Sequence, residues 1–187
     1  MRDYRPTGPG LAFPHTLLVP ASAAGVLTGL WLERPGSGWA AGAGSMAAGL
    51  VAWTLAEYVL HRFILHGFAP FRPWHLAHHR QPEVPMRTPL LFSLLLVLGL
   101  AVLPSVAGAV LGVEQGVCLA FSVGLVAGHG TQECVHAFLH RPLGRAQGWF
   151  AARWRHHDFH HHECDALAFG TQTSVWDRLL GTAAWRE

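Results

Sequence analysis

The 187-residue sequence contains no lysine, few charged residues and only three cysteines. Charged side chains make up 13% of the chain, about half of their share in a soluble globular protein. The net charge of only +2 and the lack of a basic stripe argue against a nucleic-acid-binding protein. Cys118, Cys134 and Cys164 form no CxxC pair, which excludes a disulfide scaffold and argues against a thiolate-based zinc or iron–sulfur site.

Apolar residues and histidine are what the sequence has in excess. Hydrophobic residues make up 51% of the chain, and fourteen histidines outnumber the thirteen arginines, which are its only fixed cations. This hydrophobicity excludes an intrinsically disordered chain. The length is that of one domain, and we treat residues 1–187 as a single domain.

Four apolar stretches have about the length needed to cross a bilayer as helices, which is about 17–25 residues. They are residues 16–32, 39–60, 90–112 and 115–132. Closely spaced glycines in the second stretch, such as Gly42, Gly44 and Gly49, are typical of membrane helices that approach one another closely. A cleaved signal peptide is the alternative for the first stretch, but Pro14 and Pro20 interrupt its apolar run, so we favour a span.

The arginines are distributed unequally about these four predicted spans. If both termini lie on one side of the membrane, Arg34 alone lies on the other side. The twelve remaining arginines are Arg2, Arg5, Arg62, Arg72, Arg80, Arg87, Arg141, Arg145, Arg153, Arg155, Arg178 and Arg186. Because basic residues concentrate on the cytoplasmic side, we expect a multi-pass protein with cytoplasmic termini, located in the cytoplasmic membrane if the chain is bacterial.

Twelve of the fourteen histidines lie in residues 61–89 and 133–187, on that same predicted side. Only His15 and His129 lie elsewhere; we expect His129 to be buried between helices and His15 to lie away from any site. The connections on the opposite side, 33–38 and 113–114, are too short to form a site. The sequence therefore predicts an all-α integral membrane fold: four transmembrane helices with a cytoplasmic helical cap (61–89 and 133–187) that holds a histidine-rich di-metal site.

Ten of these histidines form four clusters. The clusters are His61 with His66, His75 with His78 and His79, His136 with His140, and His157 with His160 and His161. Residues three or four positions apart share one face of a helix, so the last three clusters can each converge on one point. His61 and His66 are five positions apart, and we expect the helix to end or bend between them.

Ten imidazoles exceed the roughly four to six ligands of a single ion and suit two ions with about five ligands each. Imidazole is a good ligand for zinc, copper and iron. We therefore predict that all ten are metal ligands, with no catalytic residue beyond them. We expect four further residues to surround the ligands and orient them: Glu57, Glu133, His156 and His162. As alternatives, the two glutamates could be ligands or helix-end carboxylates, and the two histidines could face solvent.

The clusters lie within longer motifs: EYVLHRFILH at 57–66, HLAHH at 75–79, HAFLH at 136–140 and HDFHH at 157–161. A tail follows with Phe169-Gly170, Trp176-Asp177 and Gly181-Thr182. Over residues 57–182 the chain resembles the fatty acid hydroxylase / sterol desaturase family, the membrane-bound histidine-box oxygenases. The first motif and the tail are more similar to sphingolipid and fatty acyl 2-hydroxylases than to carotenoid hydroxylases.

This resemblance implies a centre of two iron ions, with zinc possible in the isolated protein, that activates O2 and oxidises an unactivated C–H bond of a lipid. Hydroxylation of a fatty acyl chain is the expected reaction. Electrons are expected from a separate protein, either cytochrome b5-like or a ferredoxin with its reductase. Four aromatic residues are candidates to contact the lipid substrate: Trp74, Trp149, Phe150 and Trp154. Anchoring at the membrane interface is their alternative role.

Other interpretations stay open. The same family includes desaturases and carotenoid or sterol hydroxylases. From a different class, a metal-binding or transport membrane protein would carry its ligands along a path inside the bilayer, whereas these clusters follow the ends of the predicted spans. A non-catalytic scaffold is disfavoured because all four clusters are complete.

Overall fold

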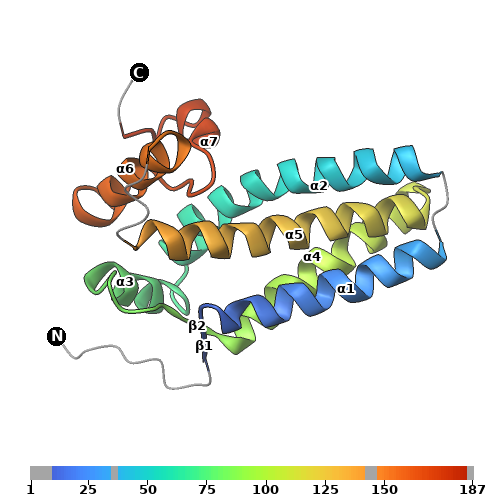
Figure 1. Ribbon diagram of the computed structural model, residues 1–187, viewed down its shortest axis with the longest axis horizontal. Helices are drawn as coiled ribbons and strands as arrows, with labels where there is room; N and C mark the ends of the chain where they lie inside the picture. Colours follow the sequence, from blue (N-terminus) through green and yellow to red (C-terminus); the bar gives the residue numbers. More distant parts are fainter. Residues whose placement is uncertain (1–9, 35–37, 142–146, 185–187) are drawn as a thin grey trace. The chain divides into compact units, whose positions relative to one another are not determined.

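The computed structural model describes residues 10–34, 38–141 and 147–184 (Figure 1). The described chain is mostly helical and divides into two compact units. We call Pro14–Trp53 with Thr88–Thr131 the stem unit. We call the other the histidine unit; it consists of Met1–Phe13, Thr54–Arg87 and Gln132–Glu187.

The stem unit is built from the four predicted apolar stretches. A short 3₁₀ helix (His15–Leu17) leads into α1 (Leu18–Glu33), and α4 covers Leu90–Leu111. The second stretch corresponds to the whole of α2 (Trp39–Val59), which lies in this unit up to Trp53, and the fourth to the first part of α5 (Gln115–Leu139). Helix α4 ends at Gly112, whose φ of 70° is a left-handed conformation that glycine adopts without strain.

Glycine lets α2 and α5 approach one another closely within the stem unit. A Cβ atom at Gly49 would collide with the carbonyl oxygen of Phe121, and one at Gly124 with that of Met46. Ser45 also donates a 2.7 Å hydrogen bond to the Val117 carbonyl. The close approach expected from the small residues of the second stretch is therefore present.

The apolar core of the stem unit joins α1 and α5. Its buried members are Leu27, Trp31, Leu119, Ala120, Val123 and Val126. Ser122 of α5 donates a 3.3 Å hydrogen bond to the Ala101 carbonyl of α4. Helix α5 therefore contacts three other helices, and much of its surface in this unit is buried rather than exposed.

Three helices are long and apolar enough to cross a membrane, by length and composition: His15–Glu33, Trp39–Leu65 and Leu90–Leu111. The fourth predicted span, 115–132, is not among them in the described part of the chain. Arg34 of the predicted charge distribution follows α1, whereas Arg2, Arg5, Arg145 and Arg186 lie outside the described residues.

The histidine unit contains the end of α2, a π-helical segment (Leu60–Leu65), α3 (Arg72–Arg80), the end of α5, α6 (Trp149–His162) and α7 (Val175–Leu179). Two short strands, β1 (Gly10–Ala12) and β2 (Arg87–Pro89), form the one small sheet of the described residues. The four histidine clusters therefore lie on helices, except that His66 and His140 directly follow the last helical residue.

Helix α5 continues to Leu139, beyond the end predicted at residue 132. No glycine or proline interrupts residues 132–139, and Val135 and Leu139 are buried there. Pro142 follows in the sequence, and the residue before a proline disfavours the helical conformation. The extension places His136 and His140 on neighbouring turns, the latter directly after the last helical residue.

Candidate metal centre

The first cluster is formed by a π-helical turn. After Val59 the chain continues as a π helix over Leu60–Leu65, and the His66 amide donates to the His61 carbonyl, five residues earlier. This wider turn brings residues five apart onto one face, so the His61 and His66 rings lie with centroids 5.1 Å apart. The helix ends at Leu65, between the two histidines as expected, but it widens into a π helix before it ends.

Five histidines converge in a first group: His61, His66, His75, His79 and His160. Their ligand atoms all lie within 4.8 Å of one another. The Nε2 atom of His75 is central, at 3.0 Å from that of His61 and 3.1 Å from those of His66 and His79. The π-helical segment, α3 and α6 each contribute to this five-histidine group.

Four histidines form a second group: His78, His136, His140 and His161, with the same 4.8 Å limit. The Nε2 atom of His140 lies 3.1 Å from that of His136, and the Nε2 atom of His78 lies 3.3 Å from that of His136. His157 adjoins this four-histidine group, since its Nε2 atom is 3.0 Å from that of His140. The structure thus brings all ten predicted histidines together, nine in the two groups and His157 beside the second.

Backbone carbonyls orient two rings of the five-histidine group. The Nδ1 atom of His61 lies 2.5 Å from the Phe169 carbonyl oxygen, and that of His160 lies 2.6 Å from the Leu167 oxygen. A carbonyl only accepts, so each Nδ1 carries the hydrogen, and in the neutral ring the Nε2 lone pair points into the group. Metal-bound histidines are typically oriented in this way.

Hydrogen bonding alone does not satisfy these nitrogens, which fits a cation in each group. The single N–H of a neutral imidazole can serve one partner, yet His75 Nε2 faces three other Nε2 atoms. Both ring nitrogens of His161 are buried and have no hydrogen-bond partner among the described residues. Buried polar atoms are normally paired, and the lone pairs of a bound ion's ligands would be satisfied by that ion.

Burial keeps these imidazoles neutral. It lowers the pKa of His66 and of His140 to about 4 in each case, and the pKa of His78 and of His160 to about 3. For His78 and His160, neighbouring imidazoles contribute to the lowered pKa in addition to burial. At neutral pH these side chains therefore offer lone pairs without first releasing a proton.

The segment Leu167–Thr171 connects the first group to two buried carboxylates. Asp177 accepts hydrogen bonds from the Phe169 and Gly170 amides at 2.8 and 2.9 Å. Glu57 accepts from the amide of Thr171 at 2.7 Å and from its hydroxyl. The predicted orienting role of Glu57 is therefore indirect at most, through this segment rather than through a ring nitrogen.

The other residues predicted to surround the ligands differ in their surroundings. His156 is buried, with Nε2 3.1 Å from Asp177 Oδ2. His162 is exposed and lies 3.6 Å from Asp158. Glu133 is half-buried on α5, one turn before His136. None of these side chains belongs to either histidine group in the described part of the chain.

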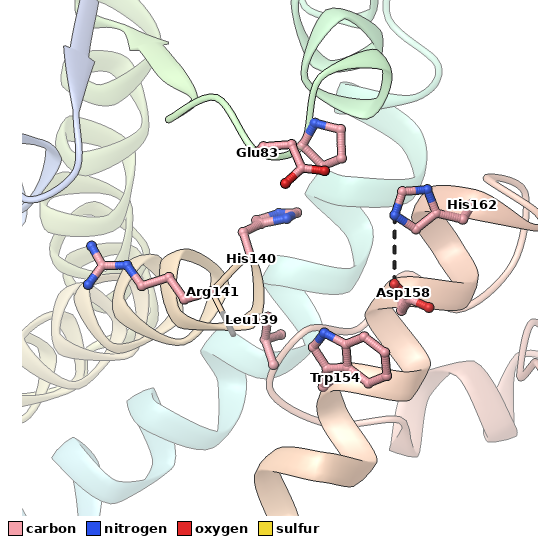
Figure 2. A pocket seen from close by; sticks show the side chains of 8 residues that line it. Glu83, Leu139, His140, Arg141, Trp154, Asp158 and His162 are labelled. Atoms are coloured by element: carbon pink, nitrogen blue, oxygen red, sulfur yellow. Dashed lines mark ion pairs between the residues drawn. The ribbon is translucent and has the colours of Figure 1, made fainter. Parts of the chain in front are cut away.

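A polar pocket opens beside the second group (Figure 2). It has a volume of about 130 Å³ and is lined by Pro82, Glu83, Leu139, His140, Arg141, Trp154, Asp158 and His162. Of the four aromatic residues predicted to contact substrate, Trp154 alone lines this pocket. Trp74 is buried and donates a hydrogen bond to the Arg87 carbonyl, whereas Trp149 and Phe150 are exposed and pack edge-to-face on each other.

The family model for fatty acid hydroxylases matches residues 46–182, a stretch that contains all ten histidines. The chain belongs to the fatty acid hydroxylase family. Membership of this metal-dependent family, together with three helices able to cross a bilayer, indicates a membrane-bound lipid hydroxylase. No curated protein matches the chain in sequence.

A solved structure titled full-length Scs7p, with only the hydroxylase domain visible, is similar to this fatty acid hydroxylase family member. The TM-score is 0.75 and the sequence identity 23%, and the match covers 95% of this chain and 68% of that one. At this identity the likeness shows a common fold.

Sequence reasoning missed the backbone groups of the site. The carbonyls of Leu167 and Phe169 carry no residue-type signal, because any residue has one. The only sequence indication was the Phe169-Gly170 and Trp176-Asp177 tail. The structure explains that tail: Gly170 leaves room for Asp177, since a Cβ atom at Gly170 would lie 2.9 Å from Oδ2 of Asp177.

Proposed function

We propose that the protein is a membrane-bound di-iron oxygenase that hydroxylates a C–H bond of a lipid, with O2 and external electrons. The observation that carries this proposal is the convergence of nine imidazoles in two groups of five and four, within a chain of the fatty acid hydroxylase family. Neutral, buried imidazoles are good ligands for iron and for zinc.

The ten histidines are the proposed ligands. One ion would be held by the five-histidine group: His61, His66, His75, His79 and His160. The other would be held by the four-histidine group, with His157 beside it: His78, His136, His140 and His161. When bound, two iron ions supply the activation of O2 and the oxidation of the lipid C–H bond. The chain's own contribution is to present the Nε2 lone pairs, to fix the rings of His61 and His160 through Nδ1, and to bury six of the ten rings away from water.

We also propose that α5 crosses the membrane as a fourth span over 115–132. Its residues Cys118, Leu119, Ala120, Val123 and Val126 are buried within the stem unit. A helix enclosed by other helices needs a less apolar surface than one that faces lipid, which accounts for its lower hydropathy. With four spans, the arginine distribution favours a cytoplasmic metal centre.

A fatty acyl chain is the proposed substrate class, on the strength of the family. The proposed electron source is a separate protein, cytochrome b5-like or a ferredoxin with its reductase. A desaturase would use the same metals and electrons but remove two hydrogen atoms, so product analysis separates the two reactions.

The test is mass spectrometry of lipid extracts from cells that express the wild-type chain or His160→Ala. We expect a lipid heavier by one oxygen atom with the wild type only. A lipid lighter by two hydrogen atoms would indicate a desaturase instead. An unchanged lipid profile together with metal-free purified protein would overturn the proposal.

The metal content of the purified protein is the second arm of the test. In detergent, we expect about two iron or zinc ions per chain, and one fewer in His160→Ala or in His140→Ala. His162→Ala is the matched control, because this neighbouring histidine is exposed and outside both groups. It should retain both ions and the product.

A further inference from the structure

We propose that Asp177 is a positioning residue for the five-histidine group: it holds the backbone segment whose carbonyls orient His61 and His160. The inference rests on the proposed function, since it requires that this group bind an ion. Asp177 itself contacts no ligand, so its action is through the Leu167–Gly170 backbone.

The two oriented rings belong to the same group. His61 comes from the π-helical segment and His160 from α6, so the chain separates them by about a hundred residues. Their Nδ1 atoms nevertheless meet carbonyls only two residues apart, those of Phe169 and Leu167. The geometry of this short segment therefore sets the direction of two of the five lone pairs.

The segment does not hold this geometry by itself. Ala168, between the two carbonyls, has φ of 60°, a left-handed conformation that costs a non-glycine residue about 1 kcal/mol or more. Its amide bonds to the Thr182 carbonyl at 2.7 Å, and the next two amides both bond to the carboxylate of Asp177. Three successive amides are thus tied to α7 and to the residue Thr182 that follows it.

Asp177 is itself fixed from two sides and is fully buried. Oδ1 accepts from the Phe169 amide and from the Thr182 hydroxyl at 2.9 Å; Oδ2 accepts from the Gly170 amide and faces His156 Nε2 at 3.1 Å. Although burial raises its pKa, the hydrogen bonds from His156, Gly170 and Thr182 lower that pKa below the ordinary value overall.

A chain of donors continues behind Thr182. Because the Thr182 hydroxyl donates to Asp177, the Tyr58 hydroxyl 2.9 Å away donates to Thr182, and Arg62 donates to Tyr58 at 2.7 Å. Together with the Phe169 and Gly170 amides and His156, the Thr182 hydroxyl makes four donors that point at the two oxygens of Asp177. A carboxylate accepts all four, whereas an asparagine would turn an NH2 group toward two of them.

The experiment measures zinc binding to the purified full-length chain in detergent. Metal-free protein is equilibrated with zinc–chelator buffers over a range of free zinc, and bound zinc per chain is counted. For Asp177→Asn we expect one of the two binding steps to weaken by about 10–100-fold, the usual effect of losing a partner that orients a ligand. The other step should keep its wild-type affinity.

Double variants assign the weakened step. His160→Ala removes a ligand of the five-histidine group, and His140→Ala one of the four-histidine group. Adding Asp177→Asn to His160→Ala should leave the remaining zinc affinity almost unchanged. Adding it to His140→Ala should weaken the one remaining zinc-binding step. Equal effects in both backgrounds would overturn the inference.

Two further measurements separate positioning from a merely structural role. The melting temperature of each metal-free variant reports folding, and a structural role would lower it without changing the ratio of the two zinc affinities. If Asp177→Asn does not fold, Thr182→Val decides: it removes one hydrogen bond to Asp177 and should weaken the same step more mildly. An unchanged ratio in a folded variant would overturn the inference.

Asp158→Asn is the matched control, because it makes the same chemical change at a half-buried aspartate of α6 that pairs with His162 and lies outside both groups. It should leave both zinc affinities unchanged. A wild-type chain that binds no zinc and no iron would overturn the proposed function and this inference with it. If the wild type binds two zinc ions and Asp177→Asn binds both with unchanged affinity, this inference alone is overturned.

Discussion

His61 and His66 face the same group although they are five positions apart, because the helix between them is wound as a π helix. A π turn is equivalent to one extra residue inserted into an α helix. Removing one residue between the two histidines would restore the α-helical spacing of four, which also keeps both side chains on one face.

Deletion of Phe63, an exposed residue of this turn, should therefore preserve the binding of both zinc ions. Insertion of an alanine after Phe63 should lose the ion of the five-histidine group, because a spacing of six turns His66 away. Zinc per chain in detergent is the measurement. Loss of zinc on deletion, with retention on insertion, would contradict the π-turn explanation.

The low pKa values predict how the stability of the metal-free protein depends on pH. Burial lowers the pKa of both His78 and His160 to about 3 from 6.5. Between these values the unfolded chain binds protons that the folded chain does not, so stability is full above pH 6.5 and falls as the pH decreases. Each histidine contributes up to about 1.4 kcal/mol per pH unit.

Melting temperatures of metal-free protein over this pH range check the prediction. His78→Asn should give a shallower dependence than the wild type, since it removes one titrating group. His162→Asn, a change at an exposed histidine, should follow the wild-type curve. If the curves of His78→Asn and the wild type have equal slopes, His78 is not held neutral by the fold.

The sequence sufficed for the helical fold and for the set of histidines that converge, because both depend on local patterns. Runs of apolar residues determine α1, α2 and α4, and spacings of three and four determine which histidines of one helix share a face. The spacings allowed each of the last three clusters to converge on one point, but the second and fourth clusters are divided between the two groups. His78 and His79 are adjacent, yet they belong to different groups, because successive residues of α3 point in different directions.

The parts that the sequence did not predict depend on backbone geometry or tertiary contact. The π turn has no residue-type signature, and the carbonyls of Leu167 and Phe169 are common to all residues. Similarly, His156 could be placed near the clustered histidines by its position in α6, but its contact with Asp177 joins residues that only the folded chain brings together.

The close approach of α2 and α5 predicts that Gly49 tolerates no side chain. Gly49→Ala would bring a methyl group against the Phe121 carbonyl, and such overpacking typically costs about 1–3 kcal/mol. Gly44→Ala on the same helix is the control, since a Cβ there meets nothing within 4 Å. In thermal denaturation in detergent, Gly49→Ala should melt earlier than the wild type and Gly44→Ala should not. Equal melting temperatures for the two variants would exclude this close approach.

Two substitutions of Glu57 separate the loss of its negative charge from the loss of its hydrogen-bond acceptor. Its Oε1 atom accepts from both the amide and the hydroxyl of Thr171, all of them buried. Glu57→Gln retains an oxygen for these donors, whereas Glu57→Ala leaves them unsatisfied at a cost of about 1–3 kcal/mol. Metal-free Glu57→Ala should therefore melt well below Glu57→Gln, and Glu33→Ala, at the exposed end of α1, should match the wild type. If Glu57→Gln and Glu57→Ala melt together, the negative charge of Glu57 rather than its acceptor role holds the segment after Phe169 in place.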